Sequence, residues 1–223
     1  MTAELEGLLP ASHRAFRRIA RSGVIAVMRG MEAESVVQIA RALLAGGVEV
    51  LEVTVDAPRA MAMIERVQAE LGGEALIGAG TVLDAETARA AILAGAEFIF
   101  TPTVDAATIR MAKRYGKAII CGAFTPTEIL NAYASGADAI KVFPANAGGP
   151  DYIKQIKAPL AQVPLIPTGG VDLGNIGDFI KAGAVAAGIG SALVSAARVK
   201  RAAWGELTAA ARQLVDAVAA ARG

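Results

Sequence analysis

Short runs of apolar residues recur along the chain, and the segments between them have the apolar spacing of amphipathic helices. The runs are rich in β-branched residues and begin about 20 to 26 residues apart, an interval that suits one strand followed by one helix. Near-continuous apolar strands are typical of a parallel sheet that is covered on both faces. The pattern predicts eight strands, over residues 24–29, 50–56, 75–80, 97–102, 118–123, 139–144, 165–170 and 184–191.

Eight consecutive strand–helix units favour an α/β fold of the (β/α)8 type, a TIM barrel, over an open doubly wound sheet. Six strands with two misassigned segments would also fit the open sheet. Two further helices, over residues 11–22 and 197–221, would cap the barrel or pack outside it. No linker interrupts the pattern, so residues 1–223 are expected to form a single domain. Helix starts are indicated by Pro58, Pro126 and Pro150 in first turns and by Asp84, Asp105 and Asp172 as N-caps.

Composition and charge narrow the class of protein. Hydrophobic residues make up 54% of the chain, which is enough apolar surface to bury a large core. The net charge of +1 gives no overall field that would attract nucleic acid or a membrane, so any anion has to be bound locally. Cys121 is the sole cysteine and lies in an apolar run, where we expect a small buried hydrophobe in a reducing compartment. With no signal peptide and no bilayer-spanning apolar stretch, the sequence predicts a soluble, cytoplasmic protein.

A lysine lies inside the sixth predicted strand. Strand alternation puts Lys141 on the same face as Ala139 and Phe143. A buried ammonium group loses much of its hydration, so a buried lysine tends to lower its pKa and become a nucleophilic amine. Imine formation requires such an amine. A lysine at a strand end could instead extend its side chain to water, and the sequence leaves both interpretations open.

A glutamate is embedded in the second predicted strand in the same way. Glu52 shares a face with Val50 and Thr54, and we count Thr54 among the substrate-binding residues. A desolvated carboxylate with a raised pKa can exchange protons near neutral pH. The alternative is a buried ion pair of Glu52 with Lys141 that has only a structural role. Such pairs often contribute little net stability, so stability alone explains this pair poorly.

Two glycine-rich segments, residues 167–171 and 188–191, follow the seventh and eighth predicted strands. Glycines allow backbone N–H groups to approach an anion, and a following helix N-terminus would add its dipole. Loops at these two positions form the usual phosphate site of a barrel, although tight turns without a ligand would use the same residues. The predicted phosphate ligands are Gly169, Gly170, Gly190 and Ser191.

Metal and catalytic-triad chemistry find little support in the sequence. His13 is the sole histidine, lies before the first predicted strand and has no neighbouring cluster of ligands. The sequence therefore predicts no metal site and no cofactor. A Mg²⁺ ion bound by carboxylates alone stays open.

From about Val24 to its C-terminal helix, the chain resembles the 2-keto-3-deoxy-6-phosphogluconate (KDPG) and 4-hydroxy-2-oxoglutarate (KHG) aldolase family. The resemblance implies a class I aldolase, which cleaves a carbon–carbon bond through a Schiff base and needs no cofactor. The matching segments are residues 48–54, 77–83, 140–144, 167–171 and 188–191.

The resemblance also implies a role for each candidate residue. Lys141 would form the Schiff base, and Glu52 would carry protons. KDPG or its galactonate epimer (KDPGal) would be cleaved to pyruvate and glyceraldehyde 3-phosphate, and KHG to pyruvate and glyoxylate. Members of the family are commonly homotrimers, so a homotrimer is implied for this chain. Thr81, Pro102, Phe143 and Thr168 would shape the pyruvate pocket, and Gly169, Gly170, Gly190 and Ser191 would hold the phosphate.

One position departs from the best-known KDPG-cleaving members. These have an arginine four residues after the glutamate, where this chain has Asp56. Residues 56–58, 27–30 and 149–154 look closer to the branch that includes the KDPGal aldolases. An arginine such as Arg29 can supply the missing cation there. We therefore expect Arg29 to bind the substrate carboxylate and Asp56 to accept hydrogen bonds from substrate hydroxyls.

Two other functions stay open on the sequence alone. Another phosphate-binding barrel enzyme, such as an isomerase or epimerase, would use the same glycine loops without a covalent lysine. A barrel that has lost catalysis and serves only assembly, including an engineered derivative, is the second alternative. The presence of both Lys141 and Glu52 argues against the second.

Overall fold

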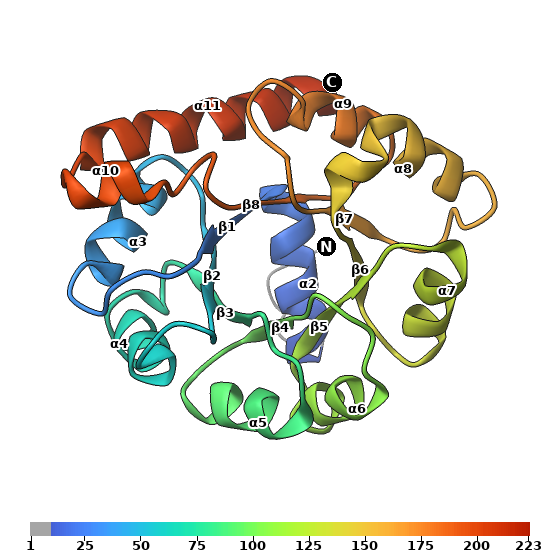
Figure 1. The fold of residues 1–223 in the computed structure, drawn as a ribbon, viewed down its shortest axis with the longest axis horizontal. Helices are drawn as coiled ribbons and strands as arrows, with labels where there is room; N and C mark the ends of the chain where they lie inside the picture. The colour runs from blue at the N-terminus through green and yellow to red at the C-terminus, as the bar shows by residue number, and fades with distance from the viewer. Residues whose placement is uncertain (1–9) are drawn as a thin grey trace.

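Eight parallel strands form one barrel-shaped sheet in the computed structural model, which describes residues 10–223 (Figure 1). Each strand pairs with the next along the chain up to β7, and β1 also pairs with β8. A bridge between Thr168 and Gly188 closes the ring between β7 and β8. The eight predicted strands and the TIM barrel are therefore confirmed. The strands are β1 (Val24–Met28), β2 (Val50–Thr54), β3 (Leu76–Gly80), β4 (Phe98–Phe100), β5 (Ala118–Ala123), β6 (Ala139–Val142), β7 (Leu165–Pro167) and β8 (Ala187–Ile189).

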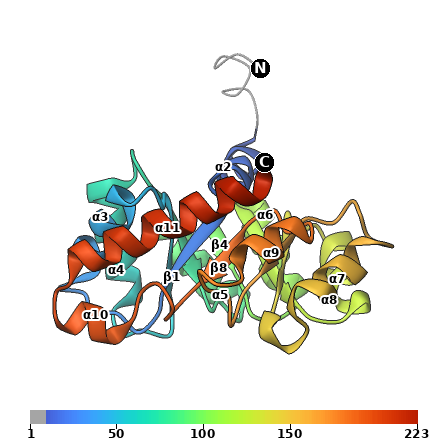
Figure 2. The ribbon, with the colours of Figure 1, turned by 90° about the horizontal axis from the view of Figure 1, so that it is seen from above.

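Helices alternate with the strands and surround the barrel (Figure 1). The long helix α11 runs along the outside of the barrel and packs against α3 and α9 (Figures 1 and 2). From residue 10 onward, none of the helices has the length and apolar character that crossing a membrane requires. The helices are α2 (Ala11–Ser22), α3 (Val36–Ala45), α4 (Ala60–Leu71), α5 (Ala85–Leu93), α6 (Ala106–Arg114), α7 (Pro126–Ala134), α8 (Gly149–Lys157), α9 (Ile176–Lys181), α10 (Ala196–Lys200) and α11 (Trp204–Arg222), with the 3-10 turn η1 (Ala145–Ala147).

Most helix starts follow the signals in the sequence. The N-cap carboxylates of Asp84 and Asp105 each accept a hydrogen bond from the backbone N–H three residues later. Each bond satisfies one of the donors that a helix start leaves unpaired. Pro126 and Pro150 lie in the first turns of α7 and α8, as predicted.

Three details of the prediction were wrong. Pro58 lies before α4, outside its first turn. Asp172 accepts the N–H of Gly174 within a turn, so it caps that turn and α9 begins only at residue 176. The helix predicted over residues 197–221 is two helices, because the chain leaves the helical conformation at Ala202, where φ is +50°. Several strands also end earlier than predicted, since the residues that follow them build the loops of the site.

Apolar side chains fill two separate layers. Along each strand, successive side chains point alternately into the barrel and outward to the helices. Val50 of β2 belongs to the inner layer, and its neighbour Leu51 belongs to the outer one. Because both faces are buried, the strands are continuous apolar runs in the sequence. The inner layer consists of Ala15, Ile19, Ile25, Val50, Leu76, Phe98, Phe100, Ala118, Ile120, Ala139, Ile166 and Ala186.

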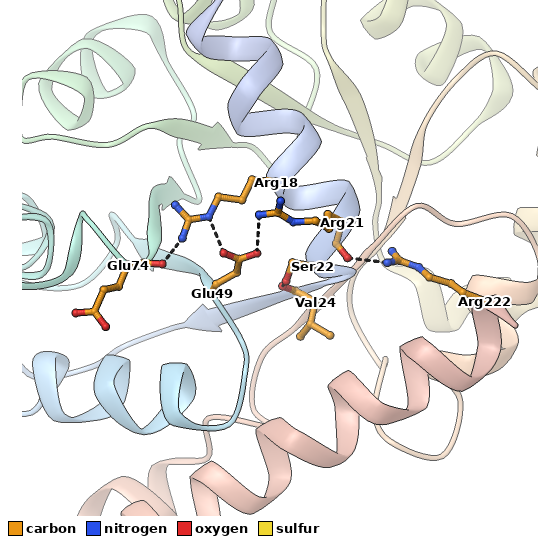
Figure 3. Close-up of polar contacts among 7 residues, drawn as sticks. All are labelled: Arg18, Arg21, Ser22, Val24, Glu49, Glu74 and Arg222. Carbon is orange, nitrogen blue, oxygen red and sulfur yellow. Dashed lines mark hydrogen bonds and ion pairs between the residues drawn. The ribbon is translucent and has the colours of Figure 1, made fainter. Parts of the chain in front are cut away.

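Helix α2 closes the barrel at the amino ends of the strands. Its Ile19 is fully buried in the inner layer, and Figure 1 shows the helix lying within the ring of strands. Figure 3 shows the polar contacts that hold it: Arg18 donates from Nε to a Glu49 carboxylate oxygen at 2.7 Å. From α11, Arg222 donates to the carbonyl oxygen of Arg21 at 2.7 Å. With this end filled, a cavity can open at the carboxyl ends of the strands.

Candidate active site

A cavity of about 410 Å³ opens at the carboxyl ends of β1, β6, β7 and β8. Loop residues from four separate parts of the chain meet there, as expected when all strands of a barrel are parallel. Eight of the thirteen predicted site residues line it, namely Arg29, Lys141, Phe143, Thr168, Gly169, Gly170, Gly190 and Ser191. The other five, Glu52, Thr54, Asp56, Thr81 and Pro102, lie outside its lining.

Lys141 is the buried cation of the cavity. It lies on β6 with 3% of its surface exposed, so its side chain does not extend to bulk water. Its Nζ lies 4.4 Å from the centre of the Phe100 ring and 4.8 Å from that of Phe143. The faces of aromatic rings attract a cation, so the two rings partly replace the water that the ammonium loses.

Glu52 lies on β2 and is fully buried. Within residues 10–223, neither of its carboxylate oxygens has a hydrogen-bond partner. The carboxylate occupies space that a glycine leaves free, because a Cβ at Gly80 would lie 1.6 Å from Glu52 Oε1. In the register of β2 and β3, Gly80 pairs with Thr54, so the carboxylate reaches up to the level of Thr54. Both oxygens are left to bind water, substrate or a proton.

The two buried groups influence each other's pKa. Burial raises the pKa of Glu52 to about 7, against the positive charges of Lys141 and Arg29, which lower it. Burial lowers the pKa of Lys141, while the negative charge of Glu52 raises it and the positive charge of Arg29 lowers it. The shifts favour a carboxyl group that exchanges protons near neutral pH and an amine that is a nucleophile. Catalytic groups characteristically have such shifts.

One guanidinium group joins the ends of three strands at the rim of the cavity. Arg29, after β1, donates from Nη1 to Asp56 Oδ2 at 2.7 Å and from Nη2 to Thr81 Oγ1 at 2.8 Å. Thr81 has a φ of +61°, a left-handed conformation that β-branched residues rarely adopt. The pair of Arg29 and Asp56 is about half exposed, so solvent screens it. These contacts fix the direction of the Arg29 side chain beside Lys141.

The glycine loops after β7 and β8 both line the cavity. Gly169 and Gly170 have φ values of +91° and +76°, which only glycine adopts readily. A Cβ at Gly170 would also lie 2.5 Å from Asn146 Cβ. Helix α9 begins only at Ile176, whereas Ala196, the first residue of α10, lines the cavity, so the expected contribution of a helix dipole stays a prediction. Any anion here would meet the N–H groups of the loops themselves.

Two threonine hydroxyls in the barrel interior lack partners. Within the described part of the chain, neither Thr54 Oγ1 nor Thr168 Oγ1 makes a hydrogen bond, and both are buried. An unpaired buried hydroxyl is costly, so each is well suited to bind water or substrate. Pro102 lines a neighbouring hollow of about 300 Å³, and Phe143 borders both hollows.

The sequence did not indicate two residues of the site: Phe100, which contacts Lys141, and Gly122, where a side chain would not fit. Phe100, the aromatic neighbour of Lys141, points inward from β4. Strand alternation indicates this direction but not the contact with Lys141. Gly122 pairs with Lys141 across β5 and β6, and a Cβ there would lie 2.2 Å from the carbonyl carbon of Pro102. This glycine lets the loop after β4 lie against β5. Spacing in the sequence does not reveal which cross-strand neighbour needs room.

No group of three or more His, Cys, Asp and Glu residues suited to a metal ion occurs in the described residues. His13 lies on α2, at the amino ends of the strands. The expectation of a site without metal or cofactor stays a prediction.

Residues 16–210 match the family described as KDPG and KHG aldolase. The 2-dehydro-3-deoxy-6-phosphogalactonate aldolase of Escherichia coli (strain K12) is 36% identical over 174 residues, 78% of this chain and 85% of that protein. The KDPG aldolase of Legionella pneumophila, solved with pyruvate captured at low pH as a covalent carbinolamine intermediate, is 30% identical with a TM-score of 0.84, over 93% of this chain and 98% of that one. A chain of a cube-shaped porous cage, designed by fusing symmetric oligomeric domains, is 34% identical with a TM-score of 0.83, over 90% of this chain and 73% of that one.

The raised pKa of Glu52 predicts a pH-dependent stability. A glutamate with the ordinary pKa of 4.5 loses its proton in the unfolded chain, whereas folded Glu52 keeps it up to about pH 7. The stability that neutral Glu52 contributes is therefore present below the lower value and is lost as pH rises to the higher one. Relative to Glu52→Gln, we expect the wild-type free energy of unfolding to fall by about 2 to 3 kcal/mol over this range. Urea denaturation at a series of pH values measures it.

The matched control for this measurement is Glu65→Gln, at an exposed position on α4. A stability difference between wild type and Glu52→Gln that stays constant from acid to neutral pH would contradict the raised pKa.

Proposed function

The chain belongs to the KDPG and KHG aldolase family of carbon–carbon lyases, and we propose that it cleaves KDPG or KDPGal to pyruvate and glyceraldehyde 3-phosphate through a Schiff base on Lys141. The observation that carries this proposal is the burial of Lys141 beside Glu52, with opposite pKa shifts that favour their neutral forms. The Legionella relative, which holds pyruvate as a covalent carbinolamine, supports a covalent intermediate in the same fold.

The first half of the reaction builds the imine. The neutral amine of Lys141 attacks the C2 carbonyl carbon of the keto acid and gives a carbinolamine. Protonated Glu52 donates the proton with which the C2 hydroxyl leaves as water, and a protonated imine remains. The imine nitrogen withdraws electrons from C3, so the bond between C3 and C4 is weakened.

The second half breaks the carbon–carbon bond. Glu52, now a carboxylate, takes the proton of the C4 hydroxyl, directly or through a water molecule. The electrons of the C3–C4 bond form a double bond between C2 and C3, and those of the imine double bond move to the nitrogen. Glyceraldehyde 3-phosphate leaves, and an enamine remains on Lys141. Glu52 returns its proton to C3, and water adds to the protonated imine that results. This releases pyruvate, restores the neutral amine and leaves one proton, which protonates Glu52 again. A carboxyl group with a pKa of about 7 suits both directions of this proton transfer.

The two charged ends of the substrate are bound by different groups in this proposal. Arg29 binds the carboxylate, with Thr54, Thr81, Pro102, Phe143 and Thr168 shaping the pyruvate pocket, and the free oxygen of Asp56 accepts a hydrogen bond from a substrate hydroxyl. The backbone N–H groups of the two glycine loops bind the phosphate dianion. KHG fits the same pyruvate pocket but lacks a phosphate, so it is the slower substrate. The phosphate ligands are Gly169, Gly170, Gly190 and Ser191.

The two alternative functions differ from this one at Lys141. An isomerase or epimerase with the same loops would have no need of a buried amine among aromatic rings. A scaffold without catalysis would have no need of a fully buried carboxylate without partners. Borohydride trapping with pyruvate separates the aldolase from both, because only the aldolase forms a reducible imine.

We also propose that the chain forms a homotrimer. Five of the seven exposed large apolar side chains in the described residues lie between β3 and α7, on consecutive units of the barrel. Consecutive units of a barrel are neighbours in space, so these side chains lie on one sector of its outer surface, where exposed apolar groups favour a contact between proteins. The designed cage, built from symmetric oligomeric domains, includes a chain of this fold and supports self-association. The five side chains are Leu83, Leu93, Val104, Tyr115 and Leu130.

Replacing the nucleophile tests the central step. Lys141→Met keeps the length of the side chain and removes the amine, so we expect no cleavage of any 2-keto-3-deoxy acid. The fold should stay intact, because the raised pKa of Glu52 allows it to be buried in its neutral form. Glu52→Gln should still form the imine with pyruvate but cleave more slowly by on the order of 100-fold. Pyruvate release and the mass of the borohydride-trapped protein measure the two steps. The matched control is Lys154→Met on α8, and activity of Lys141→Met within about tenfold of wild type would sink the proposal.

Substitutions of Arg29 and Asp56, at the rim of the cavity, test the proposed substrate specificity. Arg29→Ala should raise the KM for the keto acid by roughly one to two orders of magnitude, because a charge-assisted contact is lost. Asp56→Arg should alter the balance between KDPG and KDPGal more than it alters pyruvate binding. Values of kcat/KM for KDPG, KDPGal and KHG measure both effects, with Arg59→Ala as the control because Arg59 pairs with Glu34 on the surface at 2.7 Å. If KHG is the best substrate, or if Arg29→Ala has no effect, this binding arrangement is wrong.

The mass of the protein in solution tests the trimer. Analytical ultracentrifugation should give three times the chain mass of 22.7 kDa. Leu93→Glu should shift the mass toward that of one chain, because it places a charge on the side chain that is 63% exposed in the proposed contact region. Leu173→Glu, between β7 and α9, is the matched control. A wild-type protein with the mass of a single chain would contradict the proposed trimer.

A further inference from the structure

Arg198 of α10 holds the loop that connects β8 to α10. Its Nη1 donates to the carbonyl oxygen of Leu193 at 2.8 Å and to that of Ala192 at 3.1 Å. The side chains of Leu193 and Val194 are buried in the core, so the loop is anchored there as well. Arg198 itself lies outside the lining of the cavity, whereas Ala192 and Val194 of the loop line it.

A series of hydrogen bonds through the same loop connects Arg198 to the cavity. The peptide groups that Arg198 binds also carry the N–H groups of Leu193 and Val194. Both of these N–H groups donate to the carbonyl oxygen of Gly190, at 2.9 Å each. The carbonyl of Gly190 shares its peptide group with the N–H of Ser191. In the described part of the chain this N–H has no acceptor, and Ser191 lines the cavity.

The positive charge of Arg198 can polarise the Gly190 carbonyl through two parallel peptide groups. In a chain of hydrogen bonds, each bond polarises the next and strengthens it. The guanidinium polarises the peptides of the loop, these polarise the carbonyl of Gly190, and the N–H of Ser191 becomes a stronger donor. A phosphate dianion in the cavity would accept a hydrogen bond from that N–H.

We propose that Arg198 is a positioning residue for phosphate recognition, which fixes the loop after β8 and strengthens the Ser191 N–H without contacting the substrate. The inference rests on the proposed function, because it takes the substrate phosphate to bind at this loop. The nearby Arg201 pairs with Glu206 at 3.2 Å and, among the described residues, makes no hydrogen bond to the loop. Arg201 therefore provides a matched comparison.

The experiment compares Arg198→Met with Arg201→Met. Both substitutions remove one guanidinium near α10, but only the first removes hydrogen bonds to the loop. We expect Arg198→Met to raise the KM for KDPG about tenfold, the scale of a lost hydrogen bond to a charged group. The KM for KHG, which has no phosphate, and the rate of borohydride trapping with pyruvate should stay within about twofold of wild type. Arg201→Met should leave all three values near those of wild type.

A third variant, Arg198→Lys, keeps a charged donor of shorter reach and should give an intermediate KM for KDPG. If Arg198→Met does not fold, Arg198→Lys alone tests the inference. A KM for KDPG equal to that of wild type in Arg198→Lys would then overturn it. An unchanged KM for KDPG in Arg198→Met, or an equal rise in Arg201→Met, would overturn it while leaving the phosphate site in place. A wild-type enzyme that binds KHG as tightly as KDPG would overturn the phosphate site, and the role of Arg198 with it.

Discussion

The burial of Lys141 and Glu52 in one barrel interior is the constraint on which the rest of the site depends. Either charge alone is expensive to bury, and each lowers the cost of the other. Neither carboxylate oxygen is held by a hydrogen bond within residues 10–223, and the ammonium lies against two aromatic rings. Firm hydrogen bonds would fix both groups in their ionised forms. Without them, protons can move between the pair and a bound substrate, which is the condition for acid–base and imine chemistry.

Glycines, which have no side chain, leave the space that the buried pair and its surroundings need. Two glycines provide the space: Gly80 makes room for the Glu52 carboxylate, and Gly122, the cross-strand neighbour of Lys141, lets the loop after β4 lie against β5. Large side chains fill the inner layer below, and α2 closes the far end. Polar groups of the interior therefore meet at one end of the barrel, where water and substrate can enter.

Strand alternation and the rule that barrel sites lie at the carboxyl ends of strands were sufficient to predict the fold, the buried pair and the two glycine loops. The family resemblance added Arg29, Phe143 and Thr168 to the predicted cavity lining. Strand alternation and the barrel rule could not predict contacts between strands that are distant in sequence. The joining of Arg29 to Asp56 and Thr81, and the ring of Phe100 beside Lys141, depend on register and twist. The break between α10 and α11 was missed because the alanine-rich spacing continues through it, and the left-handed turn has no glycine to announce it.

The placing of positive charge explains how one small cavity could bind a dianion and still form a cationic imine. A guanidinium in the cavity attracts anions but opposes a second positive charge nearby, as Arg29 does when it lowers the pKa of Lys141. At the rim, Asp56 offsets part of that charge. At the phosphate end, the proposed role of Arg198 keeps the guanidinium outside the cavity and passes its effect through neutral peptide groups. Peptide N–H groups act over a short range, so they would bind the phosphate without raising the free energy of the imine on Lys141.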